Sequence, residues 1–541
     1  MMMTPDAEKK SSIETLLVGL RETLNTIEDS LQSYKIVSDE EEQKSTSGWS
    51  KEDTESLFDS ISVLVYDIIT QNPLLYHEPN FHESIVEDVT VIMMDQMNDL
   101  LAFGDTTCNC IKRQFSIQTQ SNDKQSNDKQ SNNIGCMCSS NISDETYERK
   151  KREMRNLVEN VMSIFYRYIS PRRSYKKTFV MKQSLSKTRL EKISKKIEFL
   201  KGIPQAPQRT QEWYDARSKY LTASNIWKAF GTQSSQNQLI YEKCVKKNIE
   251  VLAQQNSYVS TESTLHWGQK YEPVSLMWYE NEYSTKISDF GCIPHKSISF
   301  LAASPDGINT CIHSGRYGRM IEIKNIVNRE INGIPKMEYW VQIQMQMEVC
   351  DLNECDFIET KFVEYDGEEY YKKTLSSEAA PSEAAPSEAA PSEAAPSEAP
   401  VATGVIMFFI KNEKPLYEYS KIDITPREFE LWEAEMMEKH IGLTWNRNIY
   451  WKLEKVSCIL ILRNKLWFKS AHPVFNSIWD TIIKERETGA FLNRAPRKRS
   501  RQSPMVECKN EIVNLFADDI VNLFADDIVA DHQNCEAMSS L

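Results

Sequence analysis

The sequence predicts an α/β protein in which a mixed central sheet is flanked by helices, with helical additions at both ends. Three observations favour this class. Residues 11–104 carry apolar side chains at the three-to-four spacing of amphipathic helices. Residues 320–324 alternate between apolar and polar side chains, as a half-buried strand does. Residues 355–365 and 403–411 are predicted to be two further strands, the second of them buried.

Composition and charge narrow the class of protein. The chain has 541 residues, enough for two to four domains, and its net charge of −14 is not the overall signature of a nucleic-acid-binding protein. Basic side chains gather over residues 149–201, and the stretch after Val506 is acidic. The sequence opens with no signal peptide, and no apolar run approaches the roughly 20 residues of a membrane span. We therefore expect a soluble intracellular protein whose 12 cysteines are reduced.

Shifts in composition divide the chain into six parts. They are a helical N-terminal domain (1–106), a Cys-flanked low-complexity loop (107–144), a basic helical linker (145–202), an α/β domain (203–424), a helical, Trp-rich C-terminal extension (425–494) and a disordered tail (495–541). Within the α/β domain, a Ser-Glu-Ala-Ala-Pro repeat fills most of an insert over 376–402. Recurrent Pro breaks helices, so we expect an extended, solvated insert that interrupts a hairpin and carries no chemistry.

Two Cys-x-Cys pairs, Cys108 with Cys110 and Cys136 with Cys138, flank a polar Gln-Ser-Asn-Asp-Lys repeat. Four thiolates at the feet of one loop can hold a structural Zn²⁺ and close the loop. Cys-x-Cys is less typical of zinc sites than Cys-x-x-Cys, so free thiols beside a disordered loop are the alternative.

The basic linker carries the runs Arg-Lys-Lys-Arg and Ser-Pro-Arg-Arg-Ser-Tyr-Lys-Lys. Charged side chains on a helix commonly form a solvated face. The functional alternative is contact with a phosphate backbone, since neutralisation of phosphates by Lys and Arg dominates nucleic-acid affinity. The sequence leaves both open.

The stretch Ser304–Lys324 concentrates polar chemistry in a turn and a strand. Asp306 lies in a Ser-Pro-Asp-Gly turn, in which Pro presets φ and Gly307 permits a positive φ. Glu322 and Lys324 share one face of the predicted strand, while the isoleucines between them point into the core. Two carboxylates suit Mg²⁺, and a Lys beside such an ion can orient or help deprotonate a water molecule. We therefore expect a metal-binding cluster at the end of a hairpin.

Further motifs accompany this stretch in a fixed order. They are Trp-x-x-x-Arg at Trp213–Arg217, Leu-Thr-Ala-Ser at Leu221–Ser224, Gly-x-x-Tyr-Glu-Pro at Gly268–Pro273, Glu-Ile-Lys at Glu322–Lys324 and Gln-Ile-Gln-Met-Gln-Met at Gln342–Met347. In order and approximate spacing the sequence resembles the lambda-exonuclease-like (YqaJ viral recombinase) branch of the PD-(D/E)XK nucleases. The resemblance covers roughly 205–365, with a tail to about 412. It implies a restriction-endonuclease-like core and an origin in a large DNA virus.

The resemblance also implies roles in a phosphodiester hydrolase. Asp306 and Glu322, with the main-chain carbonyl of Ile323, would hold one Mg²⁺ or Mn²⁺, and Glu272 would complete a second site or reach the first through water. Lys324 would position the nucleophile. Gln342 would orient Lys324 or the water, with Gln344 and Gln346 as close competitors for that role.

A second group would bind the terminal 5′-phosphate of the DNA end. Its members are Arg217, Thr222, Ser224 and Ser304. An Arg fork with hydroxyl donors fits a phosphate dianion. The alternative is that Arg217 caps a helix and the small Leu-Thr-Ala-Ser residues only pack.

The resemblance implies a metal-dependent DNA exonuclease, acting 5′ to 3′ on linear duplex ends in viral recombination, repair or genome processing. A single-strand annealing protein as partner and an oligomeric assembly follow from family precedent alone. A structure-specific endonuclease and a non-catalytic DNA-binding or virion protein stay as alternatives. One departure from the family, Asn325-Ile326 in place of Cys-Pro after the Glu-Ile-Lys strand, puts the substrate path in doubt.

Overall fold

The computed structural model describes residues 51–104, 144–180, 186–205, 210–245, 261, 263–367 and 402–496. The chain divides into two compact units, residues 1–59 with 126–154, and residues 60–125 with 155–541. The described residues of the first unit are the N-terminal parts of two helices, α2 (Lys51–Gln71) and α5 (Asp144–Tyr168). An ion pair between Arg149 and Glu153, four residues apart, supports the first turns of α5.

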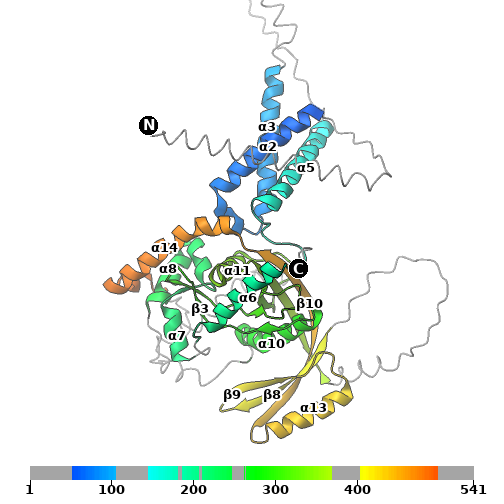
Figure 1. Cartoon of the computed structure of the whole chain (residues 1–541), viewed down its shortest axis with the longest axis vertical. Helices are drawn as coiled ribbons and strands as arrows, with labels where there is room; N and C mark the ends of the chain where they lie inside the picture. The colour runs from blue at the N-terminus through cyan, green and yellow to red at the C-terminus, as the bar shows by residue number, and fades with distance from the viewer. Residues whose placement is uncertain are drawn as a thin grey trace, which may run out of the picture. The chain divides into compact units, whose positions relative to one another are not determined.

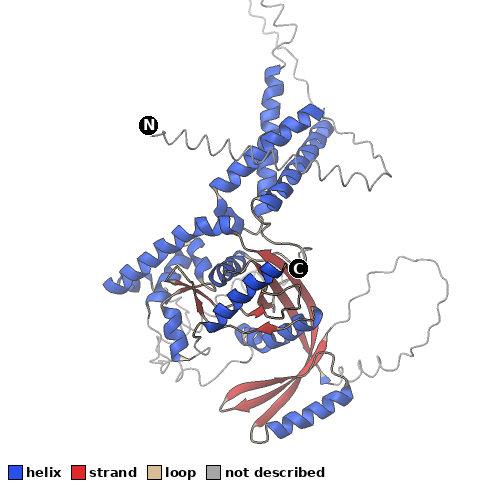
Figure 2. Cartoon of the chain, viewed as in Figure 1, coloured by secondary structure: helices blue, strands red, loops and turns tan. Residues whose placement is uncertain are grey.

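A seven-stranded sheet organises the second unit (Figure 2). In spatial order its strands are β2 (Ile287–Ser288), β5 (Gly307–Asn309), β6 (Met320–Asn325), β7 (Glu354–Tyr365), β10 (Thr444–Leu462), β8 (Thr403–Lys411) and β9 (Lys414–Tyr419). Strands β6 and β7 run parallel and the other described neighbours are antiparallel. The parallel pair needs a crossover, which helix α11 (Met337–Cys350) supplies. The predicted mixed sheet is confirmed.

Helices cover both faces of this sheet. The side chains of strand β6 point alternately to the two faces and meet a different helix on each. Its Ile321 and Ile323 pack against Tyr279 of α10 (Thr264–Glu282). Its Glu322 points to the opposite face, where Gln342 of α11 donates to it. A smaller sheet of β1 (Leu221–Thr222), β4 (Leu301–Ala303) and β3 (Ile293–Pro294), with β4 in the middle, lies in the same unit.

The predicted hairpin between the strands of residues 355–365 and 403–411 is wrong. Strand β10 lies between β7 and β8 and is antiparallel to both. Its register shifts twice, between Trp445 and Arg447 and between Leu453 and Lys455. Each shift changes the phase of the apolar alternation, which hid a strand of 19 residues in a stretch predicted to be helical and Trp-rich.

The C-terminal extension predicted over 425–494 is therefore corrected to two helices separated by a strand of the main sheet. Helix α13 (Pro426–Lys439) begins at Thr425 with a capping box to Glu428, as its Thr-Pro start predicts. It lies with β8 and β9 (yellow in Figure 1) and packs Phe429 and Met436 against β8. Helix α14 (Lys465–Thr488) and the short helix η4 (Ala490–Arg494) follow.

The remaining helices precede the sheet in the chain. They are η1 (Pro73–His77), α3 (Phe81–Gly104), α6 (Lys187–Gly202), α7 (Gln211–Ser218), η3 (Ile226–Phe230) and α8 (Gln233–Cys244). Basic side chains of α6 have structural partners: Arg189 pairs with Glu354, and Lys196 with Asp351. None of the helices in the described ranges is long and apolar enough to cross a membrane. The four cysteines of the zinc prediction and the repeats over 376–400 lie outside the described residues.

Candidate functional site

The segment that carries Asp306 joins the two sheets. It leaves β4 of the small sheet and enters β5, whose pairing with β6 ends at Gly307 opposite Ile321. Beyond that point no strand of the described ranges pairs with this edge of β6, and the Ile323 N–H donates to Asp306 Oδ2 at 2.7 Å. The N–H and C=O of one strand residue point to the same edge, so the carbonyl of Ile323 faces the same side. Asp306 therefore lies beside the Glu-Ile-Lys strand, as the sequence predicts.

Gly307 is required here for a reason other than the predicted one. It has no positive φ, unlike Gly318, Gly333 and Gly489. A Cβ atom at Gly307 would lie 2.2 Å from Cγ2 of Ile287 on the neighbouring strand β2. Close packing of β2 against β5, and not turn geometry, therefore excludes a side chain at this position.

Glu322 is fully buried, and three donors hold its carboxylate. Its Oε1 accepts from Lys324 Nζ at 2.5 Å and from Gln342 Nε2 at 2.6 Å. Its Oε2 accepts from Gln346 Nε2 at 2.7 Å. Gln344, the third candidate, points away and donates to the carbonyl of Leu462. Both Gln342 and Gln346 thus contact the predicted metal ligand.

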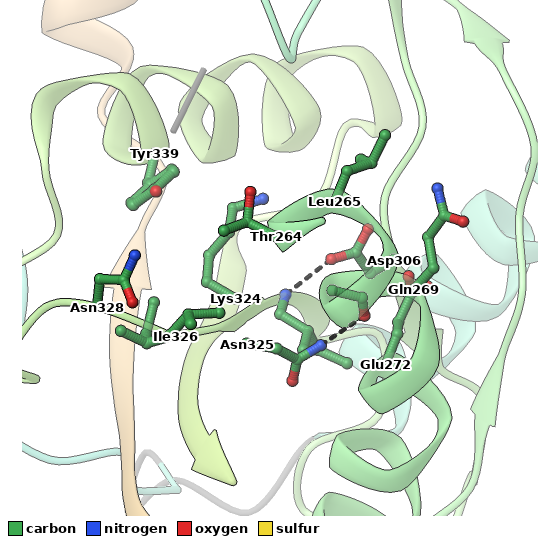
Figure 3. A pocket seen from close by; sticks show the side chains of 13 residues that line it. Thr264, Leu265, Gln269, Glu272, Asp306, Lys324, Asn325, Ile326, Asn328 and Tyr339 are labelled. Carbon is green, nitrogen blue, oxygen red and sulfur yellow. Dashed lines mark hydrogen bonds between the residues drawn. The ribbon is translucent and has the colours of Figure 1, made fainter. Parts of the chain in front are cut away.

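A pocket of about 200 Å³ lies over this cluster (Figure 3). Its lining includes Glu272 from α10, Asp306, Ile323 and Lys324 from β6, and Tyr339 from α11. Glu272, Asp306 and Lys324 face the same hollow in Figure 3. Glu322 is not part of the lining, but its carboxylate accepts a hydrogen bond from Lys324. The helix, the turn and the strand therefore bring their polar groups together as predicted, with Glu322 deeper than the rest.

Burial and like charge set the electrostatics of the pocket. Burial, and then the neighbouring carboxylate of Glu322, hold the pKa of Asp306 well above its ordinary value. Glu272 adds to this rise, while Lys324 opposes it. Burial alone would lower the pKa of Lys324, but Glu322 and Asp306 raise it above its ordinary value. Lys324 therefore keeps its proton at neutral pH, and the site has an excess of carboxylates.

No three His, Cys, Asp or Glu side chains of the described ranges form a ready-made metal cluster. The ammonium of Lys324 is instead the cation beside Glu322. The donors nevertheless fit Mg²⁺ or Mn²⁺, because the carboxylates of Glu272 and Asp306 and the backbone of Ile323 line one pocket with hard oxygen atoms. Burial, and then the like charges of Glu322 and Glu272, raise the pKa of Asp306, and a divalent cation would oppose this rise.

Three of the four predicted phosphate ligands lie together. Arg217, near the end of α7, donates from Nη1 to Ser304 Oγ at 3.4 Å and from Nη2 to Ser224 Oγ at 3.3 Å. Its guanidinium also stacks 4.6 Å over the ring of Trp213. Thr222 is 1% exposed and its hydroxyl donates to Asn225 Oδ1 at 2.8 Å, so it belongs to its own turn. The Arg217 guanidinium and the hydroxyls of Ser224 and Ser304 therefore lie together as predicted, and Thr222 is not part of this group.

Sequence reasoning missed the part played by Asn325. Its Nδ2 donates to the carbonyl of Gly268 at 2.8 Å, and its Oδ1 accepts from Ser275 and Thr360 at 2.7 Å each. One side chain thus ties β6 to α10, the helix that carries Glu272, and to β7. The available signal was the departure from the family at this position, where an amide replaces Cys.

Tyr339 is a second residue that the sequence did not single out. Its ring lines the pocket with Lys324 Nζ 5.2 Å from its centre and the guanidinium of Arg329 5.8 Å from it. Arg329 in turn pairs with the buried Glu359 of β7. These contacts hold the connection from β6 to α11 beside the pocket.

Comparisons with known proteins find similarity over the part of the chain that carries these residues. Residues 212–353 match the family model of the YqaJ-like viral recombinase domain. "Uncharacterized protein R354" of Acanthamoeba polyphaga mimivirus is 29% identical over 352 residues, which cover 61% of this chain and 60% of that protein. The chain thus spans about 60% of the length of this relative.

Two solved structures are also similar over part of the chain. One is the alkaline exonuclease LHK-Exo from Laribacter hongkongensis and the other is LHK-Exo in complex with dAMP. Each shares 17% identity with a TM-score of 0.28, and the matches cover 52–53% of this chain and 97–98% of theirs. The family predicted from the motifs is confirmed by the match to the family model. Over residues 212–353 the chain is therefore similar to the YqaJ-like viral recombinase domain.

Proposed function

We propose that this chain is a divalent-metal-dependent DNA exonuclease that digests linear duplex ends 5′ to 3′ in viral recombination, repair or genome processing. One observation carries the proposal: the pocket of Glu272, Asp306 and Lys324 lies next to the group of Arg217, Ser224 and Ser304. Ser304 and Asp306 are two residues apart on one segment. A terminal phosphate held by Arg217, Ser224 and Ser304 would therefore place a nearby phosphodiester at the pocket of Glu272, Asp306 and Lys324.

The residues divide the chemical work. Glu272, Asp306 and the carbonyl of Ile323 would hold Mg²⁺, which lowers the pKa of water and neutralises charge on the phosphate when bound. Lys324 keeps its proton, so it would orient the attacking water and stabilise developing negative charge, and would not act as the base. Glu322, which the sequence predicts as a metal ligand, is fully buried outside the pocket lining and would instead fix the position of that ammonium.

The recognition of the end would depend on Arg217. A guanidinium presents paired N–H donors that match phosphate oxygens, and the hydroxyls of Ser224 and Ser304 add two more. Both contacts of Arg217 to these hydroxyls are long, at 3.3–3.4 Å, so a phosphate would bring stronger acceptors to the same donors.

Digestion of linear duplex DNA tests the proposal. Wild type is compared with Asp306→Ala in Mg²⁺ and in EDTA, on ends with and without a 5′-phosphate. Asp480→Ala, on the exposed face of α14, is the matched control for loss of a carboxylate. We expect digestion to need the metal, to prefer the phosphorylated end, and to fall by about 10³-fold or more in Asp306→Ala. The control is expected to retain wild-type activity.

Other outcomes separate the rival functions. Cutting of closed circular DNA as fast as linear DNA would establish an endonuclease on the same site. Binding of DNA without any digestion, in Mg²⁺ or Mn²⁺, would favour a non-catalytic DNA-binding protein. Digestion from the 3′ end would reverse the proposed polarity, and a 5′-labelled substrate distinguishes the two directions.

A further inference from the structure

Gln346 connects the two halves of the site. It lies on α11, is fully buried, and its Nε2 donates to Glu322 Oε2 at 2.7 Å and to the carbonyl of Ser304 at 3.2 Å. An amide nitrogen carries two hydrogens, so both bonds form at once. One side chain therefore joins the buried carboxylate of the proposed catalytic pocket to a residue of the proposed phosphate group.

The orientation of this amide is forced by its neighbours. A rotation that exchanged its oxygen and nitrogen would place Oε1 against a carboxylate and a carbonyl, which are both acceptors. In the orientation observed, Oε1 is buried and has no hydrogen-bond partner among the described residues. Buried polar atoms without partners are uncommon and destabilising. The fold thus retains an amide at this position for its two donors.

The segment Ser304–Asp306 is held at three points. Arg217 contacts the hydroxyl of Ser304, Gln346 contacts its carbonyl, and the Ile323 N–H contacts Asp306. A phosphate that binds Arg217 would change the contact between Arg217 and the Ser304 hydroxyl. Gln346 would transmit the resulting shift of Ser304 to Glu322. Gln342 contacts Glu322 alone through the other oxygen, and Gln344 contacts neither residue in the hydrogen bonds observed.

We propose that Gln346 is a positioning residue that couples recognition of the terminal phosphate to alignment of Glu322 and Asp306. A 5′-phosphate then raises the rate of the chemical step and does not only tighten binding. This inference rests on the proposed function and deepens it. It assigns substrate discrimination to a residue that touches neither the phosphate nor the reacting atoms.

The test is the effect of a 5′-phosphate on kcat and on KM in Gln346→Met, which keeps the volume of the side chain and removes the amide. For wild type we expect the phosphate to raise kcat by about tenfold, and for Gln346→Met by less than about threefold. The effect of the phosphate on KM, which depends on Arg217, is expected to persist. Gln342→Met is the matched control, and should lower kcat on both substrates by the same factor.

A double-mutant cycle adds an independent readout. If the coupling holds, Arg217→Ala and Gln346→Met are non-additive in kcat on the phosphorylated end and additive on the hydroxyl end. If Gln346→Met does not fold, judged by its thermal transition, Gln346→Asn, which is too short to reach both acceptors, takes its place in the same measurements.

The outcomes distinguish the two levels of the proposal. A Gln346→Met protein that is slower on both ends with an unchanged phosphate ratio overturns the coupling, because a merely structural amide would act in that way. A wild type that digests both ends at the same kcat also overturns it. A wild type that digests no DNA overturns the proposed function itself.

Discussion

At the scale of single residues, the buried carboxylates of the site lower the stability of the folded protein. Asp306 and Glu322 are carboxylates in a poorly solvated position, and the ammonium of Lys324 opposes their repulsion. Asp306 gives a hard oxygen ligand, and Lys324 gives the fixed positive charge that metal-dependent phosphodiester cleavage requires. Functional sites commonly hold such unfavourable charge, and the rest of the fold compensates for it.

Asp306→Asn is expected to raise the melting temperature by a few degrees at pH 8 without divalent metal. The pKa of Asp306 is raised in the folded state, so the stability that its proton provides is present below its ordinary pKa of 3.8 and is lost as pH rises through the folded pKa. The uncharged variant avoids that loss, and the difference should vanish at low pH. Thermal melts across this range check it.

Magnesium ions should reverse the order of stability. Saturating Mg²⁺ stabilises a protein that binds it only when folded, by RT ln(1 + [L]/Kd). We expect this gain for wild type and for the surface control Asp480→Asn, and little of it for Asp306→Asn. An equal gain in all three proteins would show that the ion binds elsewhere.

At the scale of elements, helix α11 makes contacts on two faces, one toward Glu322 and one toward the end of β10. Gln342 and Gln346, one turn apart, face Glu322, while Gln344 donates to the end of β10 and Glu348 pairs with Arg463 just beyond it. The outer side of α11 is therefore fixed by the end of β10 and by Arg463, which follows that strand. Its position determines how the two amides meet the carboxylate.

Glu348→Gln should loosen that outer contact. Burial acts to raise the pKa of Glu348, but hydrogen bonds and charge from His295 and Arg463 lower it below its ordinary value of 4.5. The stability from this carboxylate is therefore present above that value and is lost as pH falls through the folded pKa. We expect a loss of about 1–3 kcal/mol at pH 7 that disappears in acid. Denaturant unfolding at several pH values measures it, with the exposed Glu435→Gln as control.

A second prediction at this scale concerns the contact between β2 and β5. Gly307→Ala places a Cβ atom 2.2 Å from Ile287 Cγ2, so it should destabilise by about 1–3 kcal/mol. Adding Ile287→Ala removes the clashing atom, and the double variant should be more stable than the sum of its single changes predicts. Gly268→Ala is the control, because its Cβ would meet no heavy atom within 4 Å. Strict additivity would contradict the packing explanation.

At the scale of the whole molecule, the sheet is completed by strands far apart in the sequence. Strand β10 pairs with β7 across more than 80 positions of the chain and with β8 across more than 30. Tyr365 at the end of β7 and Val405 near the start of β8 both pair with Tyr450 of β10, one on each side. Two strand spacings separate them, or about 10 Å.

That separation predicts the effect of removing the repeat. A few residues span about 10 Å, since an extended chain covers roughly 3.3 Å per residue. Deletion of residues 376–400 should therefore leave the melting temperature unchanged and the DNA-digesting activity within about twofold of that of wild type. A melting curve and the linear-duplex assay test it. A large loss would assign the insert a role in folding or in substrate binding.

Local patterns predicted much of the candidate site. Alternation placed Glu322 and Lys324 on one face, and the order of motifs brought in Asp306, Glu272 and Arg217. The sequence favours Gln342 among three glutamines, but Gln346 lies four residues further on the same helix face and also donates to Glu322. Strand β10 was missed because two register shifts broke its alternation.

The sequence by itself determined the composition of the site, because a turn, a strand face and a helix face depend on neighbours within a few residues. Tertiary structure alone decided that β10 separates β7 from β8, that Glu322 lies beneath Lys324, and that Gln346 joins Glu322 to Ser304. These contacts depend on strand pairing over long stretches of chain and on how each helix is rotated against the sheet. Packing of distant residues sets both, and no local pattern encodes it.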